Sequence, residues 1–79
     1  MMIKEYDVVA LTDEIQAIHK ETKQPILLKR GQVGTVLTSF NDQAYLIDFS
    51  DAGGKTYAME TVPSDSLMVL VYEPSLVNV

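Results

Sequence analysis

Apolar and polar positions alternate with a period of two over much of the chain, which predicts short β-strands rather than helices. The alternation is clean in residues 44–50, and the central stretch is residues 33–40, which follows Gly31 and contains Gly34. Gly31 stands just before the stretch and is typical of a turn with positive φ. Gly34 lies inside it, which predicts a bulge or the close approach of another backbone. The pattern therefore indicates a strand that bends within a small, curved sheet.

The same alternation recurs along the chain, with turn-forming residues between the stretches. Asn41-Asp42-Gln43 and Asp51-Ala52-Gly53-Gly54 predict tight turns, because Asn, Asp and Gly tolerate the backbone angles that such turns need. Pro63-Ser64-Asp65-Ser66 is too short for a helix and predicts one 3₁₀ turn with proline at its start. The predicted strands are residues 4–11, 33–40, 44–50, 55–62 and 67–73.

Residues 12–24 leave two interpretations open. Ile15 and Ile18 have the i, i+3 spacing of a short helix. The alternative is a long ordered loop or hairpin with residues 21–24 at its tip. Pro25 disfavours helical backbone at the residue before it, so we favour the loop or hairpin.

Five short strands, a long first connection and a 3₁₀ turn before the last strand predict an all-β fold, a small SH3-like barrel. The 79 residues are expected to form a single domain, because a chain of this length has no room for a second. Pro74 ends the last predicted strand, and residues 74–79 are expected to form a flexible tail.

Composition and charge narrow the function classes. The absence of cysteine excludes disulfides and thiolate metal ligands and fits the cytoplasm. The apolar runs are far shorter than the about 20 residues of a membrane helix, and the N-terminus is too polar for a signal peptide. We therefore expect a cytoplasmic protein without membrane association. Six basic and eleven acidic residues give a net charge of −5, which argues against nucleic acid as a partner.

Several motifs, spread in order over most of the chain, resemble those of a known family. They are Tyr6-Asp7-Val8-Val9-Ala10-Leu11, Leu28-Lys29-Arg30-Gly31-Gln32-Val33-Gly34-Thr35-Val36, Ile47-Asp48-Phe49 and Gly54-Lys55-Thr56-Tyr57-Ala58. Together they closely resemble a family of small bacterial proteins catalogued as a domain of unknown function, number 4926. The resemblance implies an SH3-like barrel in a stand-alone bacterial protein, and it implies no activity. The stretch from Gly31 to Val36 is also similar to the KOW motif of ribosomal and transcription factors and to the barrel of the nitrile hydratase β subunit.

The residue patterns predict neither catalysis nor a cofactor. His19 is the only histidine, and we find no nucleophile motif for it to serve, so we interpret it as a solvated loop residue. Gly54-Lys55-Thr56 ends like a phosphate-binding loop, but Phe49 stands where that motif needs its first glycine. A hairpin turn is the interpretation that remains, and no metal site is predicted.

Charged and aromatic positions supply the candidate partner-binding residues. Four of the six basic residues fall within eleven positions and would form one basic patch if the loop folds back on the following strand. Two acidic residues on neighbouring strands could face each other and attract a basic partner. One tyrosine beside Glu73-Pro74 is the best candidate for an exposed aromatic, whereas Tyr45, Phe49 and Tyr57 are expected in the core. The candidates are Lys20, Lys23, Lys29, Arg30, Asp48, Glu60 and Tyr72.

Three functions stay open at this level. The first is a non-enzymatic protein-binding module, either an adaptor or the neutralising partner of a two-gene pair, because an acidic surface suits a basic protein partner. The second is a KOW-like barrel that binds nucleic acid or the ribosome, which rests on the Gly31 to Val36 stretch and the basic patch. The third, a homologue of an enzyme subunit, rests on the nitrile hydratase resemblance alone. A homo-oligomer formed through an edge strand or through Leu76-Val77 also stays open.

Overall fold

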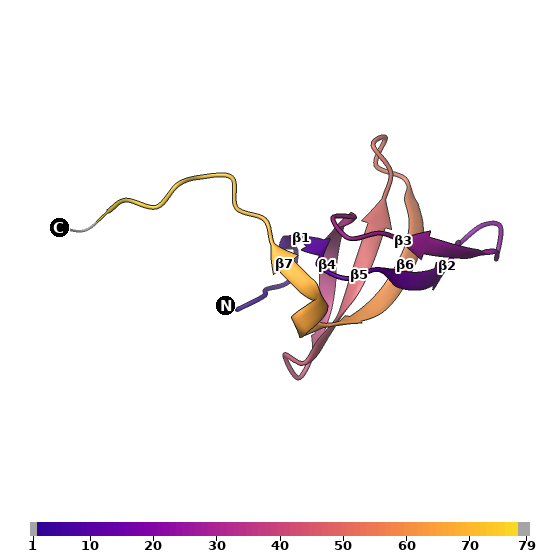
Figure 1. The fold of residues 1–79 in the computed structure, drawn as a ribbon, viewed down its shortest axis with the longest axis horizontal. Helices are drawn as coiled ribbons and strands as arrows, with labels where there is room; N and C mark the ends of the chain where they lie inside the picture. Colours follow the sequence, from indigo (N-terminus) through magenta and orange to yellow (C-terminus); the bar gives the residue numbers. More distant parts are fainter. Residues whose placement is uncertain (1, 78–79) are drawn as a thin grey trace.

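The structure is a computed structural model that describes residues 2–77. This part of the chain is all-β. Its elements are β1 (Val8–Leu11), β2 (Ile15–Ile18), β3 (Pro25–Leu28), β4 (Val33–Phe40), β5 (Ala44–Ser50), β6 (Thr56–Pro63), the 3₁₀ turn η1 (Ser64–Ser66) and β7 (Leu67–Val69). They form a five-stranded sheet in the order β6-β5-β4-β1-β7 and a separate two-stranded sheet of β2 and β3 (Figure 1).

The core lies on one face of the five-stranded sheet. Alternation along β5 directs Tyr45, Ile47 and Phe49 into it, as the sequence pattern predicts. Leu28 of β3 and Ala17 of β2 belong to the same buried cluster, so the two-stranded hairpin covers this inner face. The largest fully buried side chains are those of Phe49, Leu11, Leu28, Ile47, Val9, Val36 and Val62.

The two glycines around the start of β4 behave as predicted, each for its own reason. Gly31 has a φ of 91° and open space around its Cα, so it is required by backbone conformation. At Gly34, an added Cβ would overlap Ile47 Cγ2 and lie 3.1 Å from the carbonyl oxygen of Asp48. The ladder between β4 and β5 also shifts register between Val36 and Thr38, which bends the strand.

Residues 12–24 contain an ordered strand, so the helix is wrong and the hairpin is confirmed. β2 pairs with β3 from Ile15 opposite Leu28 to Ile18 opposite Pro25. Pro25 is the first residue of its strand, a position where a strand tolerates a missing N–H. The hairpin is attached to β6 because Glu60 Oε2 accepts a hydrogen bond from the Ile18 N–H at 3.0 Å.

Both ends of the chain are less regular than predicted. The first strand begins at Val8, because residues 4–7 form a turn in which Asp7 Oδ2 accepts from the Lys4 N–H at 2.8 Å. The last strand ends at Val69. Residues 70–77, here called the C-terminal arm, lack regular structure and extend away from the body (Figure 1). The predicted tail overlaps the arm in residues 74–77, and residues 78–79 lie outside the described residues.

Within residues 2–77, no helix has the length and apolar character needed to cross a bilayer.

Candidate functional site

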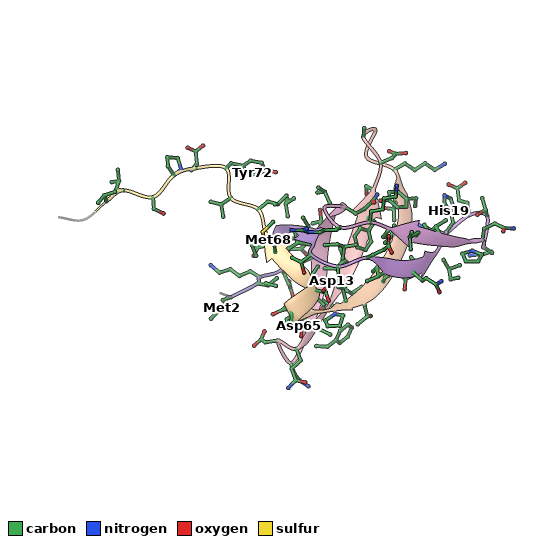
Figure 2. The ribbon with its side chains drawn as sticks, viewed as in Figure 1. Met2, Asp13, His19, Asp65, Met68 and Tyr72 are labelled. Atoms are coloured by element: carbon green, nitrogen blue, oxygen red, sulfur yellow. The ribbon has the colours of Figure 1, made fainter. Side chains whose placement is uncertain are left out.

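An open hollow of about 650 Å³ lies where the N-terminal segment, the β4–β5 turn and η1 meet. This volume is in the range of small-ligand sites. We call it the acidic hollow, because the charged side chains that line it are both aspartates. Its lining consists of Met2, Ile3, Asp42, Tyr45, Ser64, Asp65 and Leu67. Figure 2 shows Met2 and Asp65 at this side of the molecule.

Local turn chemistry positions the two aspartates at the rim. Asp42 has a φ of 58°, and its N–H donates to Ser39 Oγ at 3.0 Å, which fixes the β4–β5 turn. Across the hollow, the Ser64 N–H donates to the carbonyl oxygen of Gln43 at 2.9 Å. This bond ties η1 to the β4–β5 turn and brings Asp65 to the same rim.

The floor of the hollow is apolar, with one polar group. Ile3, Tyr45 and Leu67 are buried members of the core cluster. Among the described residues, no side-chain oxygen is both shielded from solvent and without a hydrogen-bond partner, and no hydrogen bond to the Tyr45 hydroxyl is formed. The hydroxyl is therefore accessible from the hollow. An apolar floor, a free hydroxyl and two carboxylates suit a cationic side chain with an apolar stem.

The predicted basic patch is split in two. Lys20 and Lys23 lie in the connection between β2 and β3, whereas Lys29 and Arg30 follow the far end of β3. Because a strand rises about 3.3 Å per residue, the six positions from Lys23 to Lys29 separate the two pairs by about 20 Å. The prediction of one patch is wrong, because it needed a loop that folds back and the chain instead forms an extended strand.

Lys20, Lys23 and Glu60 do meet, in a smaller hollow of about 270 Å³ beside the hairpin. Ile18 and Met59 supply its apolar lining. The Glu60 carboxylate is already occupied by the Ile18 N–H, so its structural role competes with partner binding.

Asp48 and Glu60 do not face each other, which corrects the second prediction. The ladder pairs Asp48 with Met59 and Ile47 with Glu60. Since paired residues share a face and neighbours alternate, the two carboxylates lie on opposite faces of the sheet. Asp48 Oδ1 accepts hydrogen bonds from Thr56 Oγ1 at 2.8 Å and from Ser50 Oγ at 3.1 Å, so this side chain braces β5 against β6.

The hairpin tip is held by His19 and by one ion pair. His19 Nδ1 accepts from the N–H groups of Glu21 at 3.1 Å and Thr22 at 3.2 Å, and its ring stacks on Tyr57. His19 is thus half-buried and structural, not solvated. Lys55 Nζ lies 2.8 Å from Glu21 Oε1. The hydrogen bond and charge of Lys55 lower the pKa of Glu21, and Glu21 raises the pKa of Lys55 in turn.

The aromatic residues follow the predictions with one exception. Tyr45 and Phe49 are buried, and Tyr72 is 81% exposed. Tyr57 is only half-buried, because the register shift between Phe49 and Ser50 places it at the edge of the core, where its hydroxyl accepts from Gln32 Nε2 at 2.7 Å.

The acidic hollow contains none of the candidate partner-binding residues predicted from sequence. It is formed by segments far apart in the chain, so no local motif marks it. One signal was available: once β5 and β6 are paired as a hairpin, Ala44 lies opposite Pro63. That register brings the turn before β5 next to the turn after β6, and with it Asp42 next to Asp65.

Comparison with known proteins gives a family and no activity. The model of a family described as Domain of unknown function (DUF4926) matches residues 5–69, which covers every strand of the structure. No curated protein and no solved structure matches the chain. The matched region spans well over half of the sequence, and the chain therefore belongs to the DUF4926 family.

Proposed function

We propose that this protein is a non-enzymatic protein-binding module that takes a basic segment of another protein into the acidic hollow. It would serve as an adaptor or as the neutralising partner in a two-gene pair. The observation that carries the proposal is the combination of an apolar floor with a rim charged by Asp42 and Asp65. A lysine or arginine beside an apolar residue complements both parts.

The charge of the whole chain supports the same partner. A net charge of −5 attracts a basic protein over a distance and raises the association rate. Asp65 makes no side-chain ion pair in residues 2–77, where the ion pair found is that of Lys55 with Glu21. Its carboxylate is therefore available to a ligand.

The proposed scaffold is an SH3-like barrel in a bacterial, cytoplasmic protein. Support comes from the pairing of β1 with both β4 and β7, from η1 before the last strand, and from the hairpin that attaches to β6. The KOW-like alternative, which binds nucleic acid or the ribosome, has less support because its basic residues fall into two separate groups.

Binding of a defined peptide tests the proposal. The probe is a short arginine-rich peptide with a central phenylalanine, and its control carries glutamate in place of each arginine. We expect the basic peptide to shift the amide NMR signals of Tyr45, Ser64 and Leu67, and the acidic one to leave them unchanged. Binding should weaken as salt rises from about 50 to about 300 mM, because charge pairing drives it.

Matched variants locate the site. Asp42→Asn with Asp65→Asn should weaken peptide binding about tenfold, since two exposed ion pairs at about 0.2–1 kcal/mol each approach the about 1.4 kcal/mol of a tenfold change. Glu5→Gln with Glu14→Gln changes the net charge equally but lies outside the hollow, so it should leave binding within about twofold. Equal weakening by both pairs, or no signal shift, would reject the acidic hollow. Tagged protein from its host, purified with and without nuclease, would then name the partner.

A further inference from the structure

A second surface, distinct from the acidic hollow, lies on the outer side of β4, β1 and β7. Val8 and Ala10 of β1 point away from the core, because Val9 and Leu11 point into it. The ladders place Thr35 and Val33 of β4 opposite these two residues on one side. On the other side, Met68 pairs with Ala10, and the Leu70 N–H donates to the carbonyl oxygen of Val8 at 2.9 Å.

The positions of β4, β1 and β7 on this surface have no charged side chain, and Asp48 of β5 borders it opposite Thr35. We call it the uncharged face, and it consists of Val8, Val33, Thr35, Met68 and Leu70, with the buried Ala10 between them. Met68 is 47% exposed, and Val33 is exposed to a similar degree. The six positions contain none of the 17 charged residues of the chain, which are 6 basic and 11 acidic. Interfaces are depleted in charge at their centres in the same way.

The C-terminal arm continues directly from this face and presents apolar side chains on both sides of Glu73. Val71 and Tyr72 are exposed, as are Leu76 at 94% and Val77 at 84%. Figure 1 shows the arm leaving the body beyond β7, and Figure 2 shows Tyr72 on the arm close after Met68 on the strand. The arm therefore does not cover the uncharged face of its own molecule.

We propose that the uncharged face and the C-terminal arm form the interface of a homodimer, in which each arm packs against the other copy. The surface is self-complementary, because each copy presents both a face without charge and an extended segment with apolar side chains. Around a two-fold axis, the arm of each copy packs against the face of the other. The outer edge of β7 is unpaired in the described sheet and can add a strand from the second copy.

Area favours a second copy as the occupant, and the lack of charge on these strands removes a local source of repulsion between two copies with a net charge of −5. A basic partner would find no charge to pair with there. Burial of an apolar side chain removes about 60–120 Å² from water. The six exposed apolar side chains of this face and arm then supply about 360–720 Å² per copy, which approaches the about 800 Å² of a standard interface.

Two methionines allow a matched test by sedimentation velocity on the full chain. Met68 is 47% and Met59 44% exposed, and Met59 lies on β6, at the opposite edge of the sheet. We expect the wild type to sediment as a dimer at micromolar concentration. Met68→Glu and Tyr72→Glu should each weaken the dimer at least tenfold, whereas Met59→Glu should leave its dissociation constant within about twofold.

Three results would overturn the homodimer. A wild type that remains monomeric up to millimolar concentration removes it. Dimers that persist in both Met68→Glu and Tyr72→Glu place the interface elsewhere, and equal weakening by Met59→Glu shows a general effect of charge. Circular dichroism of each variant confirms that the fold is retained. Peptide binding at the acidic hollow is measured separately, so either proposal can fail without the other.

Discussion

At the scale of single residues, Gly31 and Gly34 meet different physical requirements only three positions apart. Gly31→Ala places a side chain in the left-handed region and should cost about 1–2 kcal/mol. Gly34→Ala forces a Cβ into Ile47 and the β5 backbone and should cost about 1–3 kcal/mol through overpacking. Urea denaturation measures both values.

Asparagine separates the two causes. Asn is tolerated in the left-handed region, so Gly31→Asn should recover part of the stability lost in Gly31→Ala. Gly34→Asn should be worse than Gly34→Ala, because the longer side chain enters the same packed space. If asparagine had the same effect at both positions, the distinction between conformation and packing would be wrong.

The ion pair between Glu21 and Lys55 predicts that the free energy of unfolding depends slightly on pH. The hydrogen bond and charge of Lys55 lower the pKa of Glu21 in the folded chain. A carboxyl whose pKa is lowered by folding stabilises the folded chain at pH values above its pKa in the unfolded chain. This stabilisation is lost as the pH falls through the pKa of the folded chain. Lys55→Met should therefore raise the pKa of Glu21, which NMR titration of its side-chain carboxyl carbon measures.

The matched control is Lys4→Met, which removes the same charge far from the hairpin tip. Lys4→Met should leave the pKa of Glu21 unchanged. Both side chains of the pair are largely exposed, so Lys55→Met should hardly change the unfolding free energy at neutral pH. An unchanged Glu21 titration in Lys55→Met would show that the pair does not persist in solution.

At the scale of elements, the β2–β3 hairpin depends on few polar contacts with the main sheet. Glu60 accepts from the Ile18 N–H, and the Lys20 N–H donates to the carbonyl oxygen of Tyr57 at 2.7 Å. Glu60→Ala removes the first contact and should destabilise the hairpin by about 1–2 kcal/mol, whereas Glu60→Gln keeps an acceptor and should cost less. Amide hydrogen exchange at Ile18 and Lys20 measures the effect.

Glu14→Ala is the control for this experiment, because Glu14 is an exposed glutamate that precedes β2. It should leave exchange at Ile18 unchanged. Faster exchange in Glu60→Ala that spreads equally over β4 and β5 would contradict local opening of the hairpin.

A strand can be predicted from sequence where its buried and exposed positions differ clearly in polarity. β4 and β5 match their predicted residues 33–40 and 44–50, because buried and exposed positions alternate along them. For the β2–β3 hairpin the sequence supports two alternatives, because Ile18 and Leu27 are apolar yet exposed and obscure the alternation. Two features depend on how segments distant in sequence pack together: the separation of the basic residues into two groups, and the acidic hollow. Local sequence patterns do not contain the distances between such segments.

At the scale of the whole molecule, the elongated shape separates two surfaces. The C-terminal arm and the hairpin tip lie at opposite ends of the longest dimension of 53 Å (Figure 1). A dimer formed through the arm and the uncharged face would leave the hairpin tip accessible. The acidic hollow is lined by Leu67 of β7, so its rim would lie beside the dimer interface.

The excess of negative charge predicts that salt stabilises the protein at neutral pH. With a net charge of −5 and the Lys55–Glu21 pair as the ion pair of residues 2–77, repulsion outweighs attraction among the charges. Raising NaCl from about 10 to about 150 mM shortens the Debye length from about 30 to about 8 Å. The gain of about 0.5–1 kcal/mol should raise Tm by about 2–8 °C.

The control is the same salt series at the isoelectric point, where the sequence pI of about 4.5 leaves no net charge. The rise in Tm should vanish there, because no excess charge remains to screen. Protein concentration is held constant, since a dimer makes Tm depend on it. A Tm that falls with salt at neutral pH would show that attractive pairs dominate. An equal rise at both pH values would trace the effect to hydrophobic burial instead of charge repulsion.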